Sequence, residues 1–129
     1  MNLAGKLQIK PGSAVMVLGA PEGYLASLEP LPDGAEVVEE PGEFFDVVQA
    51  FVRDRADLDE VAEMVLEAVK PGGIVWMCYP KRTSRVPTDL TRDAGWDPLY
   101  KAGRGPVAAI SIDEVWSCLR FGLRPDPAG

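Results

Sequence analysis

The runs FDVV (residues 45–48) and VKPGGIV (residues 69–75) decide the fold of this chain. Both are predominantly apolar and mark strands. Between them, over 57–69, apolar residues recur at three- and four-residue steps, which predicts a helix with one buried stripe. Asp57 and Glu60 have the spacing of a capping box in which Asp replaces Ser or Thr. The unit therefore predicts a strand, a helix, a Pro-Gly-Gly turn and a second, parallel strand.

Outward from this unit, apolar runs separated by Gly and Pro turns predict further strands and short helices. Strands are expected over 14–18, 35–39, 44–52, 74–79, 107–112 and 115–121, and helices over 3–10, 22–28 and 88–101, the last capped by Thr88. This order predicts a single three-layer α/β domain over 1–129, with a mostly parallel sheet and a C-terminal antiparallel hairpin. Residues 124–129 are expected to be a frayed tail.

One connection departs from this pattern. Only about five residues join the strand at 35–39 to the next one, whereas a parallel crossover usually needs a dozen. The strand at 35–39 is therefore either a very short edge strand or an antiparallel one, and the sequence leaves both open. As an unpaired edge it could support a homodimer.

Length and composition are those of one globular domain. The chain has 129 residues, of which 47% are hydrophobic and 26% charged, as in ordinary folded domains. No run approaches the roughly 18 apolar residues of a membrane span, and the first eleven residues lack the apolar run of a signal peptide. The expected location is therefore the cytoplasm. In that reducing compartment Cys78 and Cys118 are expected to be two buried thiols and not a disulfide.

Several catalytic classes are excluded by residue content. The chain contains no histidine, so Ser-His-Asp and Cys-His arrangements are impossible. No GxxxxGK[ST] loop occurs, and no metal site is expected without histidine or a CxxC spacing. Glu60, Glu63 and Glu67 have helical spacing opposite the apolar stripe, which predicts a solvated face. No residue is assigned a catalytic role.

Charge is unevenly distributed along the chain. The net charge of −7 argues against binding to nucleic acid. The segment 81–104 nevertheless carries six Lys and Arg residues against three Asp residues. A basic segment in an acidic protein is a candidate for contact with an anion.

The two quoted runs and the helix between them resemble the class I S-adenosylmethionine-dependent methyltransferase fold, and the final hairpin also looks like that fold's terminal antiparallel pair. A closer resemblance, over most of the chain, is to an uncharacterised bacterial family known only as a domain of unknown function. It is carried by Lys10-Pro11-Gly12, Pro80-Lys81 and Trp116-Ser117. Together these resemblances imply a methyltransferase-like Rossmann core and no established activity.

The cofactor signature of that fold is altered here. In the methyltransferases the first strand ends in an acidic residue, followed by a GxGxG loop whose glycines let the backbone approach the cofactor. Here the acidic position falls on Val17. Gly19 and Gly23 match the outer glycines, but Pro21 replaces the middle one, bringing a ring and removing an N–H donor.

The rest of the cofactor pocket is also reduced. Glu39 or Glu40 could hold the ribose, but the segment that would supply another strand and helix after 35–39 is absent. Arg53 stands at a position that is often acidic or amide in base methylators. We therefore expect a non-catalytic domain without a cofactor. A methyltransferase that binds S-adenosylmethionine through a divergent loop is the alternative.

A ligand would bind beyond the carboxyl ends of the strands, near the strand-order switch. The loops 19–24, 53–55 and 80–91 are expected to converge there, with cations beside a helix N-terminus near Thr88, which favours an anion. The predicted partner is thus a small anionic ligand or another protein. Trp116 would wall this site if its strand lies beside strand 74–79, whereas Trp76 and Trp96 are expected in the core. The candidate ligand-binding residues are Gly19, Pro21, Gly23, Tyr24, Arg53, Lys81, Arg82, Ser84 and Trp116.

Overall fold

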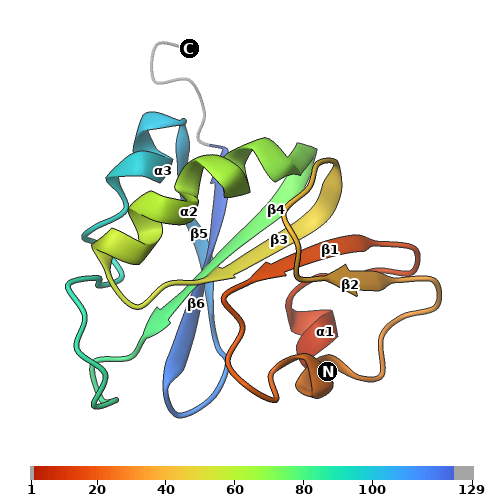
Figure 1. The fold of residues 1–129 in the computed structure, drawn as a ribbon, viewed down its shortest axis with the longest axis horizontal. Helices are drawn as coiled ribbons and strands as arrows, with labels where there is room; N and C mark the ends of the chain where they lie inside the picture. The colour runs from red at the N-terminus through yellow and green to blue at the C-terminus, as the bar shows by residue number, and fades with distance from the viewer. Residues whose placement is uncertain (1, 124–129) are drawn as a thin grey trace.

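A computed structural model describes residues 2–123 of the chain. These residues form a six-stranded sheet (Figure 1). The strand order is β2-β1-β3-β4-β6-β5, with β2, β1, β3 and β4 parallel and β6 and β5 antiparallel. The strands are β1 (Ala14–Leu18), β2 (Glu36–Val38), β3 (Phe45–Phe51), β4 (Val69–Pro80), β5 (Arg104–Ser111) and β6 (Trp116–Leu123). This confirms the mostly parallel sheet with a C-terminal antiparallel hairpin. The expected tail at 124–129 lies outside the described residues.

Alternate residues of the same strands build two separate cores, because successive side chains point to opposite faces of a sheet. Met16 and Leu18 of β1 pack with the buried stripe of α2 (Arg55–Ala68). Val15 and Val17 pack on the other face with α1 (Leu3–Lys6) and the 3₁₀ helix η1 (Leu25–Leu28). Figure 1 shows α2 lying across the strands, with α1 beside β1 and β2. The three expected layers are therefore present.

The cap of α2 lies one turn earlier than the sequence spacing predicts. Asp54 is the N-cap, and its carboxylate accepts a hydrogen bond from the Asp57 N–H at 2.9 Å. Asp57 in turn accepts from the Arg53 N–H at 2.9 Å. The expected Asp57–Glu60 cap is thus wrong, because Asp54 offers the same chemistry at the true start of the helix.

The short connection from β2 to β3 is possible because β2 has only three residues. Both strands run parallel to β1, with Val37 and Val47 opposite Val15 on its two sides. The return from Val38 to Phe45 crosses two strand spacings, about 10 Å, and moves back about three residues. Six residues reach roughly 20 Å when extended. Of the two alternatives left by the sequence, the very short parallel edge strand is the correct one.

Three predicted helices are shorter in the structure. The segment 3–10 is helical only over Leu3–Lys6, and the segment 22–28 forms only η1. The segment 88–101 is helical only in α3 (Asp97–Lys101), where Pro98 occupies the first turn that it favours. Upstream of α3 the Thr88 and Thr91 hydroxyls accept hydrogen bonds from the backbone two residues on. Such local bonds compete with helix formation, so Thr88 does not cap a helix.

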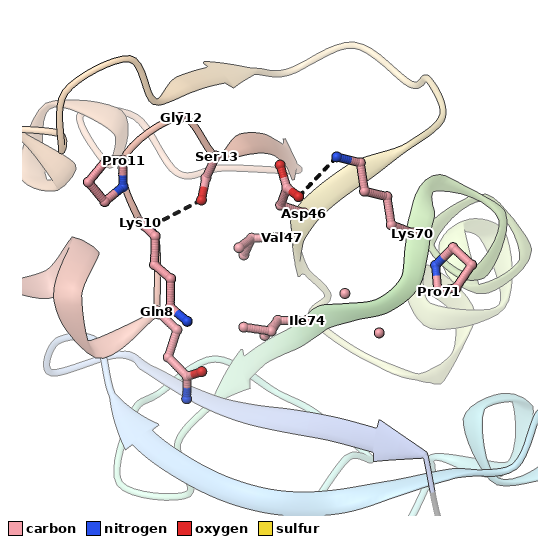
Figure 2. Close-up of a pocket in the computed structure, with 12 residues that line it drawn as sticks. Gln8, Lys10, Pro11, Gly12, Ser13, Asp46, Val47, Lys70, Pro71 and Ile74 are labelled. Atoms are coloured by element: carbon pink, nitrogen blue, oxygen red, sulfur yellow. Dashed lines mark hydrogen bonds and ion pairs between the residues drawn. The ribbon is translucent and has the colours of Figure 1, made fainter.

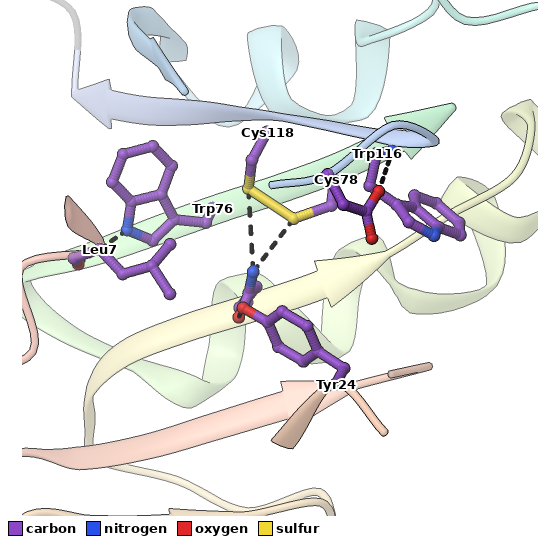
Figure 3. Close-up of a disulfide and its surroundings, with 8 residues drawn as sticks. Leu7, Tyr24, Trp76, Cys78, Trp116 and Cys118 are labelled. Atoms are coloured by element: carbon purple, nitrogen blue, oxygen red, sulfur yellow. Dashed lines mark hydrogen bonds between the residues drawn. A yellow bond between two sulfur atoms is a disulfide. The ribbon is translucent and has the colours of Figure 1, made fainter. Parts of the chain in front are cut away.

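The two cysteines form a disulfide, which contradicts the expectation of separate thiols (Figure 3). Cys78 of β4 lies directly opposite Cys118 of β6 in the antiparallel pair, and both are fully buried. The spacing of the cysteines along the chain carries no information about this register, so the sequence could not reveal it. Trp76 and Trp96 are buried, as expected, at 1% and 0% exposure.

Candidate functional site

The strand-order switch lies between β1 and β3, because the chain leaves β1 toward β2 on one side and returns to β3 on the other. A cavity of about 390 Å³ opens there, beyond the carboxyl ends of both strands. This is where ligands bind in open α/β sheets. The cavity is lined by Gly19, Pro21, Phe51, Arg53, Asp57, Glu60, Val61 and Trp116.

The loop after β1 keeps the backbone geometry of a glycine turn despite Pro21. Gly19 has φ +69° and Gly23 has φ +80°, both in the left-handed region that favours glycine. A Cβ on Gly19 would lie 2.8 Å from the Phe51 carbonyl oxygen, so no larger residue fits there. A Cβ on Gly23 would meet nothing within 4 Å. The loop is therefore tightly packed where it leaves β1 and open at its far end.

Aromatic rings form one wall of the cavity. The ring centroids of Phe51 and Trp116 are 5.1 Å apart in an edge-on arrangement, a favourable geometry for aromatic pairs. Because β6 lies beside β4, the half-buried Trp116 side chain reaches the mouth of the cavity. Figure 3 shows Trp116 at the end of the strands, on the side of the sheet that carries the disulfide.

The charged rim of this cavity is net negative. Arg53 Nε lies 2.9 Å from Asp57 Oδ2, and Arg53 Nη2 lies 3.3 Å from Asp57 Oδ1. These side-chain hydrogen bonds lower the pKa of Asp57 and raise that of Arg53. The Arg53 charge is thus balanced by Asp57, and Glu60 adds a second carboxylate to the lining. One positive and two negative charges suit a cationic ligand better than an anionic one.

The basic loop forms a different cavity. Lys81 and Arg82 line a space of about 460 Å³ with Thr83, Arg92 and Asp93, among others. The Lys81 ammonium donates to the Ser111 hydroxyl at 2.6 Å. No helix begins at Thr88, so these cations lack the helix N-terminus that was expected beside them.

Two further candidates are held by structural hydrogen bonds. The Ser84 hydroxyl donates to the Lys81 carbonyl at 2.7 Å, closing a turn. Tyr24 is buried, and its hydroxyl donates to Gln49 Oε1 at 2.8 Å; burial raises the pKa of this phenol. Of the nine candidates, only Gly19, Pro21, Arg53 and Trp116 share the switch-point cavity. Gly23 and Tyr24 line a neighbouring one of about 360 Å³, with Pro21 between the two.

Gln49 is a buried polar residue that the sequence patterns did not single out. It is 1% exposed, and its amide nitrogen donates to Cys78 Sγ at 3.2 Å, while its oxygen accepts from Tyr24 (Figure 3). The chain Tyr24–Gln49–Cys78 links the loop after β1 to the disulfide. The available signal was a single amide inside an otherwise apolar strand.

The arrangement defines a Rossmann-like domain of the methyltransferase type, with the sheet and hairpin described above. Among solved structures, the chain is similar to the ribosomal protein L11 methylase from Lactobacillus delbrueckii subsp. bulgaricus, with a TM-score of 0.64 and 12% identity over 94% of this chain and 74% of that one. It is also similar to DhpI in complex with SAH (TM-score 0.60, 16% identity, 92% and 79% covered). A SAM-dependent methyltransferase from Aquifex aeolicus has a TM-score of 0.61 and 12% identity over 92% and 86%.

At these identities the likeness shows the fold. No protein-family model and no curated protein sequence matches the chain, so the resemblance to a bacterial family of unknown function stays a prediction. Within residues 2–123, no helix is long and apolar enough to cross a membrane. The same residues hold no cluster of three or more Cys, Asp or Glu side chains suited to a metal ion.

The residues at the switch point fit one half of the cofactor that this fold implies. The open glycine loop, the aromatic wall and the negative rim suit an amino-acid chain with a sulfonium centre. On the nucleoside side, β2 ends at Val38 and is the edge of the sheet, with Glu39 and Glu40 exposed beyond it. Neither of these two carboxylates lines the switch-point cavity. Val17 is buried in the strand and offers no polar contact.

Proposed function

We propose that this chain binds S-adenosylmethionine in the switch-point cavity and acts as a methyltransferase with a divergent cofactor loop. The observation that carries the proposal is the net negative, aromatic-walled cavity beyond the carboxyl ends of β1 and β3. Cations are attracted both by carboxylates and by the faces of aromatic rings. The sulfonium is the feature that distinguishes S-adenosylmethionine from its product, S-adenosylhomocysteine.

This difference gives a direct test by calorimetric titration. The wild-type chain is expected to bind both ligands with dissociation constants in the micromolar range. Glu60→Gln should weaken the binding of S-adenosylmethionine by about two- to fivefold, as expected for the loss of one exposed charge. The affinity for S-adenosylhomocysteine should not change. Glu63→Gln is the matched control, because Glu63 is exposed on the same helix and does not line the cavity. Wild-type protein that binds neither ligand at millimolar concentration contradicts the proposal, and so does an equal loss for both ligands in Glu60→Gln.

A second candidate is a non-catalytic domain that binds a small anion or a protein partner through the basic loop. The supporting observation is the cavity at Lys81, where two arginines and one lysine face a single carboxylate, Asp93. Thermal-shift screening with pyrophosphate tests it: stabilisation that is lost in Arg82→Gln and kept in Lys101→Gln supports this candidate. No stabilisation of the wild-type chain counts against it.

A homodimer through the β2 edge is also proposed. Val38 on this edge is 39% exposed, and an unpaired edge can add a strand from another copy. Sedimentation analysis of the wild-type chain decides between monomer and dimer.

A further inference from the structure

Another cavity lies at the opposite end of β1 and β3 from the switch point. It has a volume of about 340 Å³ and opens beside the amino ends of β1 and β3 and the first residues of β4 (Figure 2). Five residues of β1 separate it from the switch point, a distance of about 15 Å. The lining residues are Gln8, Lys10, Pro11, Gly12, Ser13, Asp46, Val47, Lys70, Pro71, Gly72, Gly73 and Ile74.

Glycines leave the backbone open on two sides of this cavity. Gly12 has φ +79° and Gly72 has φ +77°, and a Cβ on either would meet nothing within 4 Å. A molecule in the cavity could therefore approach the main chain closely at both positions. The volume is at the lower end of the range for small-molecule sites.

The one carboxylate in the cavity is already engaged. Asp46 Oδ2 accepts the Ala14 N–H at 2.8 Å, and Asp46 Oδ1 accepts Lys70 Nζ at 3.0 Å. These bonds lower the pKa of Asp46, so it stays ionised and balances the Lys70 charge. Asp46 and Lys70 together contribute no net charge to the cavity.

Two hydrogen-bond donors in the cavity have no partner. Neither the Lys10 ammonium nor the Gln8 side-chain amide makes a hydrogen bond or ion pair with any residue of the described range 2–123. Figure 2 shows both side chains on one side of the cavity, facing away from the Asp46–Lys70 pair. With Lys10 the cavity carries a net charge of +1, in a protein whose net charge is −7.

Gln8 is held in a conformation that glycine would adopt more easily. Its φ is +65°. Its N–H donates to the Gly5 carbonyl, and the next N–H, of Ile9, donates to the Ala4 carbonyl. This is the Schellman ending of α1, whose left-handed position is usually glycine. A side chain kept at such a position at a cost in backbone strain points to a role in binding.

From these observations we propose that the cavity binds a small molecule through one phosphate or carboxylate group. Lys10 supplies the compensating charge, the Gln8 amide donates a hydrogen bond, and Gly12 and Gly72 allow the ligand to lie against the backbone. The site is independent of the proposed cofactor site, because it uses different residues at the opposite ends of the strands.

Titration of the ¹⁵N-labelled chain with inorganic phosphate and with acetate, followed by amide chemical shifts, tests the proposal and separates the two anion types. At least one anion should give saturable shifts at Gly12, Ser13 and Gly72, whereas sodium chloride at equal ionic strength should not. Lys10→Gln should weaken binding at least about tenfold. Lys101→Gln, which removes an exposed lysine of α3, should leave it unchanged. The proposal is overturned by wild-type protein without saturable shifts for either anion, or by equal affinities in the two variants.

Gln8→Gly separates binding from folding. Glycine suits the left-handed position, so this variant should melt a few degrees above the wild-type chain and bind the anion more weakly. A loss of binding in a more stable protein cannot come from unfolding. Unchanged binding in Gln8→Gly would remove Gln8 from the site and contradict the proposed role of its strained backbone.

Discussion

Removal of the Cys78–Cys118 disulfide is expected to cost the domain much of its stability. The two cysteines are 40 residues apart in sequence. Loop-closure entropy for a loop of that length corresponds to about 4 kcal/mol at 25 °C. An unfolding entropy of roughly 2.1 cal/mol/K per residue gives about 0.27 kcal/mol/K for 129 residues. The melting temperature should therefore fall by about 14 °C.

The assay compares thermal unfolding of the wild-type chain, before and after reduction, with the double variant Cys78→Ala/Cys118→Ala. Because both sulfurs are fully buried, the reductant is added to unfolded protein before refolding. The reduced wild-type chain should have about the same melting temperature as the double variant. Reductant should not change the melting temperature of the double variant. Two free thiols in protein purified without reductant would refute the reasoning, and so would an unchanged melting temperature after reduction. Disulfides are typical of oxidising compartments, so the same thiol count in protein from cells also tests the predicted cytoplasmic location.

Three further substitutions and one pH profile test other parts of the structure. Hydrogen bonds lower the pKa of Asp46 in the folded state. Its contribution to stability is therefore present above its unfolded pKa and is lost as the pH falls through the folded pKa. In urea unfolding between pH 6 and about pH 2, the free energy of unfolding should fall less steeply with decreasing pH for Asp46→Asn than for the wild-type chain. Gly19→Ala should cost about 2 kcal/mol or more, because its Cβ would press on the Phe51 carbonyl at a positive φ. Trp116→Ala should lower the free energy of unfolding by only about 1–2 kcal/mol, because the ring is half-buried. The same variant should bind S-adenosylhomocysteine more weakly in calorimetry. Asp54→Ala should cost about 1 kcal/mol in urea unfolding through loss of the helix cap.

Strong local patterns explain why the centre of the fold could be predicted. The runs at 45–48 and 69–75 and the stripe of α2 each have one consistent interpretation, and the structure confirms the parallel strands and the helix between them. The boundaries were less accurate. The helix ends at Ala68 and β4 begins at once with Val69, whereas the next strand was expected only from residue 74. Lys70 therefore belongs to β4, where it pairs with Asp46.

Weak or non-local signals explain the failures. The expected helix at 88–101 was to begin at a Thr88 cap, but the Thr88 and Thr91 hydroxyls accept hydrogen bonds from the backbone two residues on and hold that stretch irregular. The disulfide depends on the register of β4 against β6, which no local pattern specifies. At the candidate site, the solvated face expected for Glu60, Glu63 and Glu67 is confirmed, because all three residues are exposed. No local pattern shows that Glu60 also lines the switch-point cavity.

The sheet and the ligand chemistry depend on different parts of the chain. A three-residue β2 lets six residues return to β3, so the parallel core closes without a crossover helix between these two strands. Both proposed ligand sites lie at ends of β3, whose carboxyl end borders a net negative cavity and whose amino end, at Asp46, borders a net positive one. The stretch of β3 between Asp46 and Phe51 holds these cavities about 15 Å apart. The double variant Lys10→Gln/Glu60→Gln should therefore lose affinity for each ligand by the same factor as the single variant that affects that ligand.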